Sequence, residues 1–207
     1  EIDIFSIEET KAILEATKME PIHIRVLIEL ALFTALRRGE LVGLKWSDID
    51  FEKQQLTVKR SIYKPKGENA IEKEPKTLSS IRTISIPNCL CETLQYYKKK
   101  QAENSLSLGE RWKNLDYLFT DEFGNVMNPQ TPTKQFSKFL ERHNIRHLKF
   151  HCLRHTSATL LLSGGCDIKT VSARLGHSSI ETTNIYVHAI ESIDRKAAIM
   201  FDFFVKE

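Results

Sequence analysis

Residues 151–156, which read HCLRHT, form the densest group of chemistry-bearing side chains in this 207-residue chain. His151 and Arg154 are three positions apart, so on one helical turn they face the same side. A guanidinium group binds two oxygens at once and keeps its proton at pH 7. This arginine with a neighbouring imidazole therefore suits the binding of a phosphate group.

A second arginine is available on the N-terminal side. Residues 34–40, TALRRGE, end an apolar helix that we expect to start near Pro21, and the pair Arg37 and Arg38 follows at once. Cations at a helix C-terminus interact favourably with the helix dipole, which alone could explain the pair. Beside a phosphate-binding segment, one of the two becomes a candidate second ligand.

A third segment lies on the C-terminal side, where residues 175–188 read LGHSSIETTNIYVH. It contains His177 and Tyr186. Taken alone, Tyr186 is more typical of a packing aromatic residue, because most tyrosines bury the ring and satisfy the hydroxyl locally. Tyr186 becomes a candidate reactive residue only when this segment is considered together with residues 34–40 and 151–156.

The charge is unevenly distributed, although the chain as a whole carries only +3. Residues 53–82 contain eight Lys and Arg against three Glu, and residues 134–154 contain six against one. The remainder of the chain is acidic. Two basic stretches indicate a surface that meets a polyanion such as nucleic acid, although solvated charges that only maintain solubility are an equal alternative.

Composition limits the class of protein. Hydrophobic residues make up 41% and charged residues 28%, which is typical of a soluble globular chain. The apolar stretch 26–36 contains Glu29 and is too short to span a membrane. Four cysteines without regular spacing favour the reduced thiols of a cytosolic protein. We therefore expect no membrane partner.

The periodicity predicts a mainly helical α+β fold with a small antiparallel sheet. Ser6 and Glu9 form a capping box in the sequence and predict a first helix over residues 7–17. Alternating residues predict strands at 55–63 and 81–86, joined by an exposed loop or a longer hairpin at 64–80. Further predictions are a helix from Pro87 to about 104, a short extended segment at 117–120, a helix starting at Asn128-Pro129, then successive helices ending with 190–204.

These segments, in this order, resemble the tyrosine recombinase or phage integrase family. The resemblance runs from residues 5–9, FSIEE, to beyond Tyr186, which lies nine residues after His177. Residues 75–77, PKT, followed by SIRTI at 80–84, are more similar to integrases of conjugative transposons and related phages. The resemblance implies the catalytic-domain fold of DNA breaking-rejoining enzymes.

The resemblance also implies site residues and a reaction. It maps the catalytic set onto Arg37, Lys76, His151, Arg154, His177 and Tyr186. Tyr186 would attack a DNA phosphodiester and form a 3′-phosphotyrosyl link, with His151 as proton acceptor. Lys76 would protonate the leaving 5′-oxygen, and the arginines and His177 would contact the phosphate. No metal or other cofactor is expected.

Some of these assignments have competitors. Arg38 competes with Arg37, and Lys66 and Lys73 compete with Lys76. Glu40 is expected to brace Arg37, and His155 to anchor its helix as a structural residue. The family commonly has Gly where this chain has Ala35. The basic side chains proposed to contact DNA are Lys59, Arg60, Lys64, Lys66, Arg82 and Lys149.

Three other functions are consistent with parts of the sequence. A DNA-binding relative could keep the fold without the chemistry, and a type IB topoisomerase has a similar site. Histidines at 143, 147, 151 and 155 could bind zinc on one helix, but its ends would lie about 18 Å apart. A helix start near residues 149–150 would break that ladder.

The resemblance further implies partners and domain organisation. Residues 1–207 would form one catalytic domain, the C-terminal part of a longer integrase that encircles double-stranded DNA. A homotetramer on DNA and an accessory DNA-bending or excision factor are expected. The apolar segment 190–207 is expected to pack on its own domain or on a neighbouring protomer.

Overall fold

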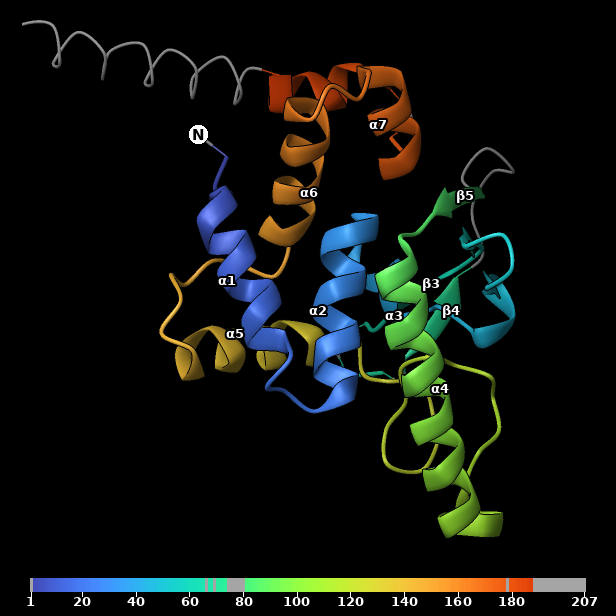
Figure 1. Ribbon diagram of the computed structural model, residues 1–207. Coiled ribbons are helices and arrows are strands. Elements are labelled where there is room, and N and C mark those ends of the chain that lie inside the picture. The colour runs from blue at the N-terminus through green and yellow to red at the C-terminus, as the bar shows by residue number, and fades with distance from the viewer. Residues whose placement is uncertain (1, 66, 69, 74–80, 178, 188–207) are drawn as a thin grey trace, which may run out of the picture.

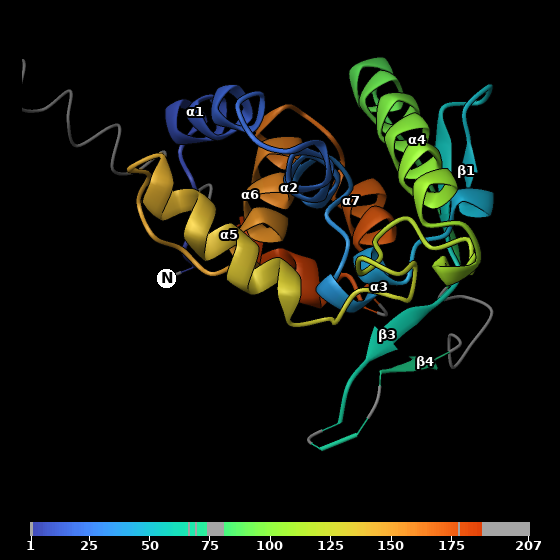
Figure 2. The same ribbon diagram turned by 90° about the horizontal axis from the view of Figure 1, so that it is seen from below.

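The computed structural model describes residues 2–65, 67–68, 70–73, 81–177 and 179–187. Its helices gather around one central helix, α2 (Ile22–Thr34), and a small sheet lies to one side, next to α4 (Asn88–Leu108) (Figures 1 and 2). The remaining α-helices with defined bounds are α1 (Ile7–Thr17), α3 (Arg38–Val42), α5 (Thr131–Arg142), α6 (Cys152–Ser163) and α7 (Ile168–Leu175). Residues 181–187 are also helical.

The first two helices follow from their sequences. The Glu9 amide donates to Ser6 Oγ at 3.1 Å and the Ser6 amide donates to Glu9 Oε2 at 2.7 Å, so the predicted capping box and the bounds of α1 are confirmed. Helix α2 is apolar on nearly all sides because α1, α4, α5 and α6 pack around it. It ends at Ala35, whose φ of 55° lies in the left-handed region that favours glycine.

The three-stranded sheet has the order β1 (Ile49–Asp50), β2 (Gln55–Val58), β5 (Arg82–Ser85), with antiparallel pairs. The prediction of one strand over 55–63 is wrong. After β2 the chain leaves the sheet, and β3 (Ser61–Tyr63) pairs instead with β4 (Ile71–Lys73) in a hairpin that projects from the molecule in Figure 2.

The break between β2 and β3 has a local cause. Both residues between the strands, Lys59 and Arg60, pair with the buried carboxylate of Asp48. The Arg60 guanidinium also donates to the carbonyl of Gly43 at 3.2 Å, so these side chains hold the chain at the end of β2. Of the two alternatives for residues 64–80, the longer hairpin is confirmed by β4; residues 66, 69 and 74–80 lie outside the described residues.

Two helix boundaries differ from the sequence prediction. Helix α4 continues four residues beyond the predicted end and stops at Leu108. Helix α5 starts at Thr131, with Pro132 in its first turn, whereas the prediction placed its start at Asn128. The side chain of Asn128 accepts from the Gln130 amide at 3.0 Å in an Asx turn, so this residue turns the chain before the helix instead of capping it.

The remaining segments complete two hydrophobic clusters. Residues 117–120 do not form the predicted extended segment: Tyr117 and Thr120 make isolated bridges to Lys45 and Val126, and the two residues between them bend. Most buried apolar side chains form one cluster around α2. A smaller second cluster consists of Ala35, Ala158, Val171, Leu175 and Tyr186.

No helix in the described part of the chain is long and apolar enough to cross a membrane. The predicted helix 190–204 lies outside the described residues.

Candidate active site

Arg154 is at the centre of the candidate site and is only 3% exposed. One arm of its guanidinium donates to the Ala35 carbonyl at 2.5 Å, directly after α2. The other arm donates to the Leu175 carbonyl at 2.9 Å and to His177 Nε2 at 2.9 Å. Helix α6 thereby brings the predicted arginine into contact with two segments that are distant in sequence.

The His177 ring has a defined hydrogen-bonding state. Because a guanidinium can only donate, Nε2 of His177 accepts from Arg154, and Nδ1 donates to Thr183 Oγ1 at 2.8 Å. Burial, reinforced by the positive charges of Arg154, Arg37 and Arg82, lowers the pKa of His177 to about 4. The ring is therefore neutral at pH 7 in this DNA-free state.

Arg37 and Arg82 are both held by Glu40. Arg37 donates to Glu40 Oε1 at 3.0 Å and to the Gly176 carbonyl at 3.1 Å. Arg82 donates to both Glu40 oxygens, at 3.2 and 2.7 Å, and to the Arg174 carbonyl at 2.8 Å. The expectation that Glu40 braces Arg37 is confirmed, and the same carboxylate also positions Arg82.

Glycine is required where α7 turns into the site. Gly176 has a φ of +65°, and a Cβ added there would lie 2.6 Å from a guanidinium nitrogen of Arg82. This close approach lets the Gly176 carbonyl reach Arg37 and places His177 beside Arg154.

Tyr186 lies at the same site with its ring almost fully buried, at 1% exposure. Its ring is nearly parallel to that of His177, with centroids 6.5 Å apart. The hydroxyl is 2.9 Å from Nδ1 of His155. The predicted proton acceptor, His151, instead packs edge-on against His155, with ring centroids 4.6 Å apart.

The site has more positive than negative charge. We call Arg37, Arg82 and Arg154 the arginine cluster; the carboxylate that pairs with it in the described residues is Glu40. Burial and the neighbouring Arg37 lower the pKa of Arg154 to about 10, and Glu40 offsets this only in part. An anion bound here would relieve the unfavourable burial of positive charge, as expected of a phosphate-binding site.

Arg38 lies apart from the arginine cluster. Its guanidinium donates to Thr133 Oγ1 at 3.0 Å, and together with Lys149 and His151 it lines a pocket of about 350 Å³. Of the two candidates, Arg37 is therefore the one that reaches the turn carrying His177, through the carbonyl of Gly176.

The proposed DNA-contacting residues have different surroundings. Lys59 and Arg60 pair with Asp48, and Arg82 belongs to the arginine cluster. Lys64 and Lys149 are exposed. Lys66 and the predicted catalytic Lys76 lie outside the described residues, whereas Lys73 lies in β4 over the ring of Tyr63.

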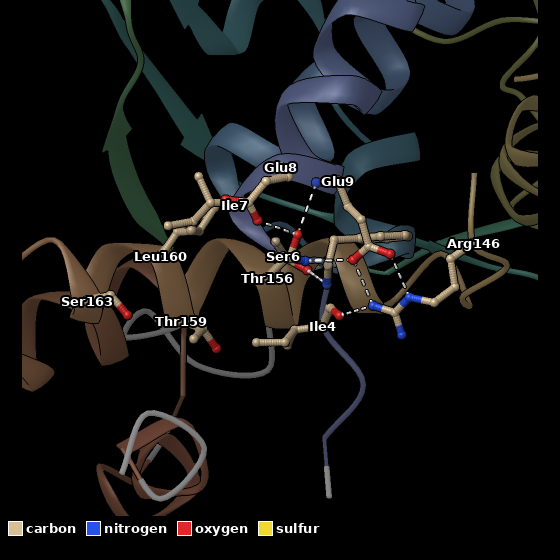
Figure 3. Close-up of a pocket in the computed structure, with 11 residues that line it drawn as sticks. Ile4, Ser6, Ile7, Glu8, Glu9, Arg146, Thr156, Thr159, Leu160 and Ser163 are labelled. Atoms are coloured by element: carbon tan, nitrogen blue, oxygen red, sulfur yellow. Dashed lines mark hydrogen bonds and ion pairs between the residues drawn. The ribbon is translucent and has the colours of Figure 1, made fainter. Parts of the chain in front are cut away.

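A larger apolar cavity of about 400 Å³ lies on another face of α6 (Figure 3). Thr156, Thr159 and Leu160 line it from α6, opposite the start of α1. Arg146 borders it through hydrogen bonds to Glu9 and to the Ile4 carbonyl. None of the predicted catalytic residues lines this cavity.

The histidine ladder is not continuous. His143 follows the end of α5 and bonds to Glu20, whereas His147 bonds to Ser137. His151 and His155 belong to the start of α6, as the predicted helix start near residues 149–150 requires. Among the described residues, no group of three or more His, Cys, Asp or Glu side chains is arranged to hold a metal ion.

Sequence reasoning missed three positions at this site. The sequence predicts His155 as a structural residue, but it contacts Tyr186; it predicts Arg82 as a DNA contact, but Glu40 holds this side chain. Thr183 was not singled out. Its spacing three residues before Tyr186, on the same helix, is the signal that could have identified it.

Two half-buried histidines predict a loss of stability in mild acid. Both His155 and His177 have a pKa of about 4, below that of an unfolded histidine, mainly because of burial. Between pH 6.5 and 4 the unfolded chain therefore binds more protons, and the free energy of unfolding falls as pH decreases. From pH 7 to 5 we expect a loss of about 1–2 kcal/mol for each histidine, measured by urea unfolding.

A variant provides the control. His155→Asn removes one of the two titrating rings and should reduce the dependence on pH over the same range. Stability that increased on acidification from pH 7 to 5 would contradict this account.

Comparisons with known proteins point to one family. Residues 4–192 match the model of the phage integrase family. A tyrosine recombinase XerC-like protein from Caldanaerobacter subterraneus subsp. tengcongensis is 44% identical over 202 residues, covering 92% of this chain and 51% of that protein. The ICEBs1 integrase of Bacillus subtilis is 29% identical, covering 94% and 53%. The chain thus spans about half the length of these curated relatives.

Solved structures share the fold. The Tn1549 transposon integrase in complex with transposon right end DNA superposes with a TM-score of 0.77 at 22% identity, covering 95% of this chain and 67% of that one. The XerA recombinase superposes with a TM-score of 0.73 at 26% identity, covering 96% and 64%. Both integrases and recombinases of the Xer type are therefore among the similar proteins.

Proposed function

Because this chain belongs to the phage integrase family, we propose that it breaks and rejoins double-stranded DNA in site-specific recombination, with Tyr186 as the nucleophile. The observation that supports this most directly is the position of Tyr186. Its hydroxyl contacts His155, and its ring is parallel to that of His177, which is bonded to Arg154. A phenol beside the buried guanidinium of Arg154 is suited to attack on a bound phosphodiester.

In the proposed reaction, Tyr186 Oη forms a bond to phosphorus and the bond to the 5′-oxygen breaks. Arg37 and Arg154 would hold the non-bridging oxygens, where negative charge increases in the transition state. As the family resemblance implies, His151 would take the tyrosine proton and Lys76 would protonate the 5′-oxygen. In the DNA-free protein the hydroxyl lies against His155 and His151 packs on His155, so transfer to His151 would require bound DNA to bring the two groups together. Attack by a 5′-hydroxyl of another duplex reverses these steps and completes the exchange of strands.

Binding of DNA would also change the state of His177. Its Nε2 accepts from Arg154 in the DNA-free protein, so it has no proton to offer a phosphate there. A phosphate bound to Arg154 would raise the pKa of His177 and favour protonation of Nε2. His177 would then donate to the phosphate while Nδ1 keeps its bond to Thr183.

The DNA surface would extend from the site over the exposed side chains Lys64 and Lys149 and the proposed Lys66. Lys59, Arg60 and Arg82 are committed to ion pairs, so we propose that they position this surface. Binding that depends on phosphate contacts weakens with salt. A homotetramer on DNA, an accessory DNA-bending or excision factor and action in the bacterial cytoplasm remain part of the proposal.

The test is a covalent-trapping experiment with the full-length protein, in EDTA, on a library of nicked duplexes with randomised core sequence. Cleavage next to a nick releases a short fragment, so the phosphotyrosyl product accumulates. We expect a protein–DNA adduct joined through a 3′-phosphate, identified on denaturing gels and by mass spectrometry after proteolysis. An adduct that needed added zinc, or DNA binding without any adduct, would contradict the proposal. Relaxation of plasmid DNA without strand exchange would indicate the topoisomerase alternative.

A further inference from the structure

The contact between His155 and Tyr186 joins two helices. His155 follows Arg154 on α6, and Tyr186 lies in the helical segment 181–187. Nδ1 of His155 and the tyrosine hydroxyl are 2.9 Å apart, and the two ring centroids are 5.5 Å apart with the rings tilted by 47°. The imidazole therefore meets the phenol at its hydroxyl end.

The ionisation of the two groups keeps the proton on the tyrosine in the DNA-free protein. Burial, followed by the nearby His151 and Arg154, lowers the pKa of His155 to about 4. Burial raises the pKa of Tyr186, and Arg154 and Arg37 offset this only in part. A neutral imidazole with so low a pKa is a poor base but a competent hydrogen-bond acceptor.

The electrostatics of the site give this hydrogen bond a direction. The positive charge of Arg154 favours electron density on the phenolic oxygen, so the oxygen lone pairs are stabilised where they face the guanidinium. The hydroxyl hydrogen then points to Nδ1 of His155. In this orientation the attacking lone pairs face the arginine cluster.

Packing fixes the ring but not the hydroxyl. The side chains of Ala35, Ala158, Val171 and Leu175 form the buried cluster with the Tyr186 ring. These apolar groups offer no hydrogen bond, so rotation about the bond between ring and oxygen is controlled by polar neighbours. Within the described residues, the polar neighbours of this hydroxyl are His155, at hydrogen-bonding distance, and the guanidinium of Arg154, which can only donate to the oxygen.

We propose that His155 is a positioning residue for the recombination reaction: its Nδ1 accepts a hydrogen bond from Tyr186 and aims the lone pairs of the nucleophile at the phosphate site. The inference rests on the proposed function, since it assigns a role within that reaction. It differs from the role of His151, because His155 orients the hydroxyl and does not take the proton.

Three substitutions separate this role from a structural one. The Oδ1 atom of asparagine occupies nearly the same position as Nδ1 of histidine, so His155→Asn keeps an acceptor that cannot take up a proton. His155→Gln moves the amide one carbon further away, and His155→Phe keeps a ring without an acceptor. The full-length variants are compared by the single-turnover rate of adduct formation on the nicked duplexes, with DNA affinity and thermal unfolding measured in parallel.

We expect His155→Asn to retain the wild-type rate within about fivefold, whereas His155→Gln and His155→Phe lose about 100-fold at unchanged DNA affinity. The exposed His147→Asn serves as the matched control and should not change the rate. If His155→Phe were as fast as the wild type, or if His155→Asn were as slow as His155→Phe, the positioning role would be excluded. The second result would indicate that His155 itself transfers a proton.

A measurement without DNA distinguishes failure of this inference from failure of the proposed function. Labelling tyrosine at the carbon that bears the hydroxyl gives one NMR signal for each tyrosine, and the signal missing from Tyr186→Phe identifies Tyr186. We expect its shift to change in His155→Phe and to be restored towards wild type in His155→Asn. An unchanged signal would refute the hydrogen bond even if the wild-type protein forms adducts; a changed signal without adducts would leave the bond supported and the proposed function refuted.

Discussion

Replacing Tyr186 with phenylalanine is expected to abolish covalent attachment to DNA and to leave DNA binding within about threefold of wild type. The substitution removes one oxygen, the atom that would bond to phosphorus, so the adduct should fall at least about 10⁴-fold, to the background level. The ring keeps its contacts in the cluster with Ala35 and Leu175. Loss of the hydrogen bond to His155 should cost only about 1 kcal/mol of stability.

The measurement is the amount of adduct on a nicked duplex, together with affinity from a gel-shift titration. Tyr97→Phe is the matched control, because it removes a hydroxyl from another buried tyrosine, on α4 and outside the site. That variant should form adducts at the wild-type rate. An adduct that persisted in Tyr186→Phe would show that another residue is the nucleophile.

Replacing Arg154 with lysine is expected to reduce both the rate and the stability. The planar guanidinium reaches the Ala35 carbonyl with one arm and the Leu175 carbonyl and His177 with the other. A single ammonium group keeps the charge but cannot span these acceptors. We expect adduct formation to slow by about 10²–10³-fold and the free energy of unfolding to fall by about 1–3 kcal/mol.

Arg142→Lys is the control for this exchange, since Arg142 also makes a two-armed interaction, with Glu20, but lies on α5 away from the site. It should keep the wild-type rate. The rate is measured by single-turnover trapping and the stability by urea unfolding. An Arg154→Lys variant that formed adducts as fast as the wild type would show that the two-armed geometry is not needed for the reaction.

Local signals in the sequence predicted the helical elements well. The capping box between Ser6 and Glu9 predicts where α1 starts, because all atoms of that motif lie within one helical turn. The strand prediction over residues 55–63 failed, because the apolar residues on the two sides of Lys59 and Arg60 keep the same period of two and give no sign of a break. Their ion pairs with Asp48, about a dozen residues earlier in the chain, redirect the backbone.

The sequence predicts which residues belong to the candidate site better than it predicts which of them touch. Motif spacing identified Arg37, Arg154, His177 and Tyr186, which the fold brings together. Spacing could not show which histidine reaches Tyr186, because His151 and His155 lie one turn apart on α6 and both face the site. The way α6 packs against the segment 181–187 determines that His155, and not His151, reaches the Tyr186 hydroxyl.

The buried hydrogen bonds of Arg154 determine when, during synthesis of the chain, the candidate site can form. They connect the end of α2, the start of α6 and the end of α7, so the first partner, Ala35, is 119 residues away in sequence. Such contacts form late, after the intervening chain has folded. A nascent chain that has not yet completed α7 therefore lacks the contacts that position Arg154, and the candidate site can form only after α7 has been synthesised.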